Sequence, residues 1–367
     1  MPRVWVLFLI VSLLWLTPAS GASPRTGEQL FLAACATCHG PDGRGAPQEA
    51  LGFAGVEPPD FTDCSFATRE ADLDWLGVAH RGGPGRAFAR EMASFGAALD
   101  RAQLQSILDH IRTFCSDTRW PRGELNFPRP FATEKAFPED EAVISSSAAI
   151  DGPGNISNKF VYEQRVGPRS QFELIVPFGW SETRGPGSGN AWEGGVGDIA
   201  VGMKHVLAYS FDRGSILAVA GEVKLPTGSE SKGFGSGTTI FEPFVSFGQR
   251  LPGRSFVQVQ TGAEIPFDRD HSDEGFFRIA LGRTFREQEF GRAWTPIVEF
   301  TGGAEFDAPS SVHWDVIPQV QVSISTRQHI LGCAGVRLPV NDRDDKDPQL
   351  VLYLLWDWFD GGLTDGW

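Results

Sequence analysis

The stretch AACATCHGPDGRG, residues 33–45, contains a C-x-x-C-H motif formed by Cys35, Cys38 and His39. Two thiols separated by two residues can each form a thioether bond to one porphyrin, and the adjacent imidazole can then bind the iron. The motif therefore predicts one covalently bound haem c, with Cys35 and Cys38 as attachment residues and His39 as an axial ligand. The alternative is a redox-active or disulfide-bonded cysteine pair beside an incidental histidine.

Amphipathic helices are predicted on both sides of this motif. Thr26 and Gln29 have the spacing of a capping box ahead of GEQLFLAACATCH, and Asp100 and Gln103 have it ahead of residues 101–115. Apolar side chains recur at helical spacing in the second helix, at Leu104, Ile107, Leu108, Ile111 and Phe114. We expect these two helices to cross over the edge of a porphyrin.

Residues 25–116 resemble the class I cytochromes c. The resemblance rests on Gly27 and Phe31 in the first helix, on CATCHG, and on MASFG at residues 92–96. It implies an all-α domain that carries one electron at a time on its haem iron. It also implies that the domain is an electron carrier and not itself an enzyme.

Met92 is the expected second axial ligand, because it stands where this family has its distal methionine. It is also the one thioether of the mature domain, since Met1 is expected to leave with a signal peptide and Met203 lies far downstream. Two alternatives stay open. Met92 can be a core-packing residue, or His80 can serve as the sixth ligand.

Cys64 and Cys115 are the other two cysteines of this region. In an oxidising compartment a bond between them would close a long loop, which stabilises a domain by about 3 to 4 kcal/mol. We favour this disulfide over two free thiols.

The first 22 residues predict export. Arg3 is a short basic region, an apolar run follows from Val4 to Leu16, and small residues lie at 19–22. After this segment no apolar run is long enough for a transmembrane helix. The net charge of −14 argues against a nucleic-acid partner, because phosphate backbones are bound through clustered Lys and Arg.

The length of 367 residues favours more than one domain. We assign 1–22 to a signal peptide, 23–116 to the cytochrome c domain, 117–141 to a Pro-rich and charged linker of extended character, and 142–367 to an all-β domain. Twelve antiparallel strands are predicted near residues 142–150, 158–166, 170–180, 195–209, 214–226, 237–250, 255–267, 275–286, 293–306, 311–325, 328–340 and 348–359.

The strands alternate as those of an outer-membrane-type barrel do, with an apolar outer face and a polar lumen face. Phe172, Leu174 and Val176, for example, oppose Gln171 and Glu173. Short connections alternate with longer ones, the strand number is even, and the chain closes on aromatic residues. Candidate lumen side chains are Glu163, Arg165, Glu222, Lys224 and Arg278.

Two features oppose this prediction. Pro177, Pro243, Pro296 and Pro318 fall inside strands, where proline removes a ladder hydrogen bond, and the first strand contains SSSAA. A large exported β-sandwich or soluble barrel is therefore the alternative. The segments GVGDIAVGMKHVL, LAVAGEVKLPTG and FEPFVSFGQRL nevertheless resemble the outer-membrane family associated with the phenol meta-pathway, over residues 142–359.

Three hypotheses for function follow. The first is a monohaem c-type cytochrome tethered to an outer-membrane barrel as an electron conduit or docking protein, facing periplasmic redox proteins and contacting outer-membrane lipid. The second is a channel for small hydrophobic or aromatic solutes with an accessory cytochrome. The third is a soluble periplasmic cytochrome with a β-rich binding module.

Overall fold

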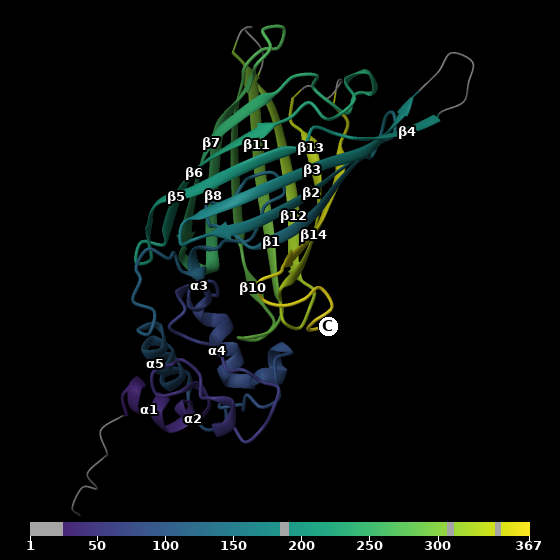
Figure 1. The fold of residues 1–367 in the computed structure, drawn as a ribbon. Helices are drawn as coiled ribbons and strands as arrows, with labels where there is room; N and C mark the ends of the chain where they lie inside the picture. Colours follow the sequence, from purple (N-terminus) through teal and green to yellow (C-terminus); the bar gives the residue numbers. More distant parts are fainter. Residues whose placement is uncertain (1–24, 184–190, 307–311, 342–345) are drawn as a thin grey trace, which may run out of the picture.

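The computed structural model describes residues 25–183, 191–306, 312–341 and 346–367, and the predicted signal peptide lies outside these ranges. A small helical domain lies at one end of a β-barrel, next to the C-terminus of the chain (Figure 1). No helix among the described residues is long and apolar enough to cross a membrane.

The helical domain contains the two predicted helices, and both have the expected capping boxes. Gly27 lets these helices pack closely, because a Cβ there would lie only 1.9 Å from the carbonyl oxygen of Ser106. The helices of the domain are α1 (Gly27–Ala34), α2 (Ala36–His39), α3 (Cys64–Ala67), α4 (Asp72–Arg81) and α5 (Arg101–Arg112), with 3₁₀ turns η1 (Gln48–Ala50) and η2 (Gly83–Arg86). A third 3₁₀ turn, η3 (Gly123–Leu125), follows this domain.

Fourteen strands form one antiparallel sheet, and the pairing of the first strand, β1, with the last, β14, closes it into a ring. The strands are β1 (Glu141–Ala149), β2 (Asn155–Val166), β3 (Ser170–Thr183), β4 (Ala191–Val196), β5 (Ala200–Ser210), β6 (Ser215–Lys224), β7 (Ile240–Leu251), β8 (Ser255–Pro266), β9 (Glu274–Arg283), β10 (Phe285–Arg286), β11 (Ala293–Glu305), β12 (His313–Ser323), β13 (Ile330–Pro339) and β14 (Gln349–Asp357). Without the short β4 and β10, twelve of the described strands form the closed ring. The predicted twelve-stranded barrel is therefore confirmed. The sequence analysis missed β4, which extends the sheet beside the end of β3.

The barrel has its apolar side chains outside and its polar side chains inside. Leu350, Leu352 and Leu354 of β14 are each about 40% exposed, whereas Gln171 and Glu173 of β3 are buried. This is the reverse of a water-soluble protein, in which an apolar belt of this size would be an exposed patch. The barrel is thus of the outer-membrane type, and its closed ladder satisfies its backbone polar groups within lipid.

The strand prolines lie at interruptions of the ladder. The β7–β8 pairing skips from Phe241 to Phe244 around Pro243, and the β12–β13 pairing skips from Val316 to Gln319 around Pro318. Pro177 and Pro296 likewise lie where the pairing with one neighbouring strand stops. Because each proline faces a gap on one side, its missing N–H is tolerated within the barrel.

The two ends of the barrel differ in their connections. The strands that meet at the end facing the helical domain are joined by short turns, such as residues 167–169 and 211–214, as expected. The opposite end carries longer connections, including η4 (Glu230–Lys232). Of the expected outer loops, residues 307–311 and the middle parts of 181–194 and 341–347 lie outside the described residues.

The predicted linker is not an exposed tether. Residues 126–140, here called the plug segment, have no helix or strand but enter the barrel lumen and return to β1. Side chains of the strands donate hydrogen bonds to carbonyl oxygens of the plug segment. Gln258 donates to Pro128 at 2.8 Å, Tyr353 to Arg129 at 2.7 Å and Arg278 to Ala132 at 3.1 Å. The plug segment therefore fills the half of the lumen nearer the helical domain.

Apolar packing adds to these hydrogen bonds. Phe127 stacks on Phe256 of β8 with ring centroids 5.7 Å apart, within a buried cluster that also contains Phe137 and Ile216. The segment has no helix or strand, and it is not the expected tether, because its side chains are buried among apolar and charged partners in the lumen.

Candidate haem site

Cys35, Cys38 and His39 lie at the junction of the first two helices. Cys35 ends α1 and precedes α2, which carries Cys38 and His39. Both thiols are free in the structure, so Cys35 and Cys38 do not form the alternative disulfide. All three residues line a cavity of about 710 Å³. The side chains around them are largely apolar, among them Phe61, Phe95, Leu99, Leu104 and Ile107.

The His39 imidazole is placed for ligation. Its ring stacks on Phe61 with centroids 4.9 Å apart, and its Nδ1 is buried without a hydrogen-bond partner among the described residues. Burial lowers the pKa of His39 below its usual value. The imidazole is therefore neutral at physiological pH, which is the form that binds metals.

Met92 lines the same cavity, whereas His80 does not. The loop that carries Met92 is fixed by backbone hydrogen bonds, including one of 2.9 Å from the Gly83 amide to the Met92 carbonyl. The ring of His80 packs instead against Phe290, with centroids 5.0 Å apart. This arrangement favours Met92 over His80 as the sixth ligand.

The cysteines at positions 64 and 115 form the disulfide that we favoured, with Cα atoms 5.1 Å apart. It joins the start of α3 to the segment after α5. Phe61 and Phe66, on either side of Cys64, line the cavity. The disulfide therefore ties one wall of the cavity to the helix that forms another.

Comparison with known families agrees with this geometry. Residues 25–114 match the family described as Cytochrome c. The chain carries a cytochrome c domain. Two thiols, a neutral imidazole and a thioether around one apolar cavity fit a haem c, with Cys35 and Cys38 for attachment and His39 and Met92 for the iron.

The barrel was compared in the same way. Residues 158–293 match the family described as "Putative MetA-pathway of phenol degradation". An outer membrane channel from Pseudomonas putida F1 is similar at 12% identity and a TM-score of 0.43, over 63% of this chain and 99% of that one. The KdgM porin gives 9% identity and a TM-score of 0.38, over 59% and 98%. A search of curated proteins gives no match.

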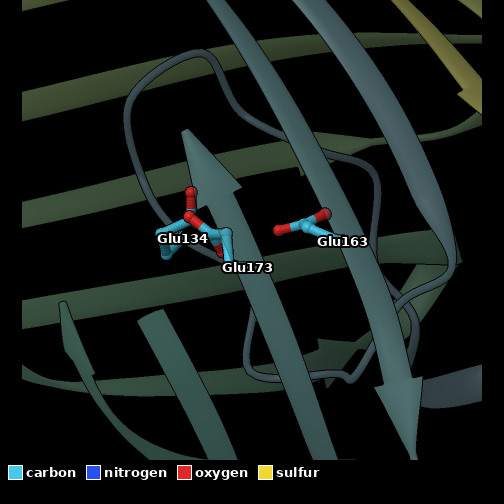
Figure 2. Close-up of side chains that lie close together, drawn as sticks. All are labelled: Glu134, Glu163 and Glu173. Carbon is cyan, nitrogen blue, oxygen red and sulfur yellow. The ribbon is translucent and has the colours of Figure 1, made fainter. Parts of the chain in front are cut away.

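A second polar cluster lies beyond the cytochrome c domain, in the lumen. Glu134 of the plug segment, Glu163 of β2 and Glu173 of β3 place carboxylate oxygens within 4.8 Å of one another (Figure 2). Arg129 bonds to Glu134 at 3.1 Å and to Glu163 at 3.0 Å. The ion pair between Arg129 and Glu163 therefore links the plug segment to the barrel wall.

The sequence analysis found part of this cluster. It placed Glu163 in the lumen, together with Arg165, Glu222, Lys224 and Arg278, and these side chains point inward as predicted. It missed Arg129 and Glu134, because they lie in the segment expected to be a linker. The sequence signal that could have indicated these two residues is the high charge content of that Pro-rich stretch. An exposed linker has the same composition, so this signal does not distinguish the two.

Proposed function

We propose that the cytochrome c domain holds one covalently bound haem and transfers one electron at a time, while the barrel anchors it at the inner face of the outer membrane. The observation that carries this proposal is the single cavity lined by Cys35, Cys38, His39 and Met92. The chain has one C-x-x-C-H motif, so one haem per chain is expected.

The haem supplies the redox-active iron, and the residues of this chain determine its surroundings. Cys35 and Cys38 hold the macrocycle, and the neutral His39 imidazole and the Met92 thioether are the iron ligands. Thioether ligation raises the potential relative to a second imidazole. With His39 and Met92 both bound, the iron would have no open position, which favours electron transfer over binding of small molecules.

The plug segment supports an anchoring role for the barrel over solute transport. It occupies the lumen half nearer the cytochrome c domain and is bonded there by side chains of several strands. The other half holds ion pairs, such as Lys224 with Glu242 at 2.6 Å and with Glu264 at 2.8 Å. A lumen filled with side chains is typical of small barrels. Docking of the carrier at the membrane is therefore favoured over conduction.

The expected partners are periplasmic redox proteins, and the expected lipid contact is with the outer membrane. The predicted signal peptide supports export. The short turns at the cytochrome-facing end and the longer loops at the opposite end support a periplasmic cytochrome c domain.

Haem content tests the first half of this proposal. Acid-acetone extraction followed by a pyridine haemochrome spectrum should show one haem that stays with the protein, and a redox titration should fit one electron. Replacing both Cys35 and Cys38 by Ala should abolish the covalent haem, and Cys333→Ala should retain it. Extractable haem in the unmodified protein would rule out the assigned attachment.

Topology is tested separately on a Cys333→Ala background. Ser231→Cys places a thiol in a long loop, and Arg213→Cys places one in a short turn; both positions are exposed. A membrane-impermeant maleimide added to whole cells should label the first and spare the second. Labelling of both, or recovery of the protein in the soluble periplasmic fraction, would refute the anchored orientation.

A further inference from the structure

The end of the barrel that faces the cytochrome c domain packs into its core. The connection of residues 284–292, between β9 and β11, inserts Phe290, which is only 3% exposed. Phe290 belongs to the same buried cluster as Leu76 of α4 and Leu104 of α5. A Cβ built at Gly77 of α4 would lie in van der Waals contact with the Phe290 Cβ, at 3.4 Å, so the connection packs directly on α4.

Polar contacts surround the inserted ring. Arg101 of α5 pairs with Glu289 at 2.6 Å, and Arg81 donates to Gln288 at 3.1 Å. The turn of residues 324–329, between β12 and β13, adds Arg327, which donates to the Ala87 carbonyl. We call residues 284–292 and 324–329 the rim turns. They are part of the packing of the cytochrome c domain.

The haem cavity extends to these rim turns. The cavity that contains Cys35, Cys38 and His39 is also lined by Arg286 and Arg327 from the barrel. Arg86 of η2, 3% exposed, lines it from the cytochrome c domain. One wall of the haem cavity is therefore built by residues more than two hundred positions away from the attachment motif.

Two guanidinium groups on this wall have unused donors. The Nε atoms of Arg86 and Arg327 are buried without a hydrogen-bond partner among the described residues. A buried donor on a charged group without an acceptor is destabilising, and carboxylates are the acceptors that arginine binds most strongly. An acceptor inside the cavity would satisfy both groups.

The protein carboxylates nearby approach other nitrogens of these groups: Asp365 lies 3.7 Å from Nη1 of Arg327. Asp74 already accepts from Arg86 at 2.8 Å and from Arg286 at 3.3 Å. Burial raises the pKa of Glu70 well above its usual range, and it raises the pKa of Asp360 to about 7. Burial therefore weakens the charge on both carboxyls, and neither Nε atom has an acceptor among the described residues.

We propose that the rim turns of the barrel are part of the haem site, with Arg327, together with Arg86, donating to the propionate carboxylates of the haem. The propionates are the ionised groups of this cofactor, so they match the unused donors in charge and in hydrogen-bonding capacity. This inference rests on the proposed function, because it requires the haem predicted there.

The barrel then tunes the redox potential. A guanidinium beside a propionate adds positive charge near the iron, which favours the reduced state. It also keeps the propionate ionised across neutral pH. Removing the charge of Arg327 should therefore lower the midpoint potential. It should also make the pH dependence of the potential steeper than the one caused by Asp360, because an unpaired propionate takes up a proton on reduction.

The test is a redox titration of the detergent-solubilised full chain between pH 6 and 8. Arg327→Gln and Arg86→Gln should each shift the midpoint potential downward, changing the one-electron equilibrium constant roughly three- to tenfold. Arg327→Lys keeps the charge and should lie close to the unmodified protein. Arg213→Gln is the matched control, an exposed arginine on a short turn away from the cavity, and should cause no shift.

The outcomes separate this inference from the proposed function. Absence of covalent haem in the unmodified protein would refute the proposed function. Covalent haem with the same potential and pH dependence in Arg327→Gln, Arg86→Gln and Arg213→Gln would overturn the inference alone. If a Gln variant is not recovered, redox-difference infrared spectra of an Asp360→Asn protein give the same decision, because this change removes the protein carboxyl that titrates near pH 7. Protonated carboxyl bands that appear on reduction at pH 7 would then contradict paired propionates.

Discussion

At the scale of single residues, one cavity brings together the thiols of Cys35 and Cys38, the His39 imidazole and the Met92 thioether. The attachment residues and His39 lie within five positions, and no tertiary information is needed to recognise them. Met92 was predicted as a ligand partly because it is the one thioether of the mature domain. In the structure it lines the cavity, whereas His80 does not. Arg327 was not predictable, since nothing in its turn indicates contact with a distant domain.

We expect Met92→Ala to remove the weak far-red absorption band that sulfur–iron ligation gives to the ferric protein. The midpoint potential should fall, because the thioether favours reduced iron. Absorption spectra and a redox titration measure both effects. His80→Ala should retain the band. A Met92→Ala protein with an unchanged band and potential would assign the sixth ligand to another residue.

Loss of the disulfide should destabilise the cytochrome c domain. Replacing Cys64 and Cys115 together by Ser should lower its free energy of unfolding by about 2 to 4 kcal/mol, because the cross-link restricts the unfolded chain over 51 positions. Denaturant titration followed by haem absorbance measures this loss. Cys333→Ala, in the barrel, should not change the denaturant midpoint of that transition. Equal destabilisation by the two changes would argue against a stabilising role of the Cys64–Cys115 disulfide.

At the scale of elements, the strands were predictable because alternation is a local property, and each of the twelve ring strands has a predicted counterpart within a few residues. The strand prolines were correctly seen as anomalies, but only the pairing shows that they face gaps in the ladder. The plug segment could not be predicted. Its burial depends on a lumen made by strands that are distant in sequence.

Arg129 is the central cation of the plug segment. It pairs with Glu134, with Glu141 at 2.6 Å and with Glu163. Arg129→Met should destabilise the barrel by about 3 to 5 kcal/mol, because buried carboxylates lose their partner. Urea unfolding of the barrel, followed by heat-modifiable gel mobility, measures the change. Lys232→Met in the exposed η4 is the control, and a loss of the same size there would contradict the assigned role.

At the scale of the whole molecule, the two domains share a core and a cavity. A loose linker between the domains was expected from the sequence, since the rim turns resemble ordinary hairpin connections. The contacts of Phe290 with α4 and α5 make the barrel a structural part of the cytochrome c domain. The relation between the domains is therefore set by packing of side chains and not by the length of a linker.

Stability of this joint should depend on pH through Asp360, which faces Arg327, Arg86 and Asp74. Burial raises the pKa of Asp360 from 3.8 to about 7, so the folded protein holds its proton more tightly than the unfolded chain. This contribution is fully present below about pH 4 and is lost as the pH rises to about 7.

Urea unfolding of the cytochrome c domain at pH 5 and pH 8 measures this dependence. Asp360→Asn should flatten the decline in stability between the two pH values. Asp268→Asn, on the connection between β8 and β9 at the far end of the barrel, is the control and should keep the decline. An Asp360→Asn protein with the slope of the unmodified protein would show that another group controls the joint.

The path of the plug segment has a consequence for how the chain assembles. The segment enters the lumen beside the cytochrome c domain and leaves at Glu141, the start of β1, which lies at the same end of the barrel. The polypeptide is therefore inserted as a loop and never passes through the ring. The β1–β14 seam can close before the loop enters or around it, and a folded domain carrying its cofactor never has to cross the pore. Topology alone thus leaves haem attachment and barrel insertion free to occur in either order.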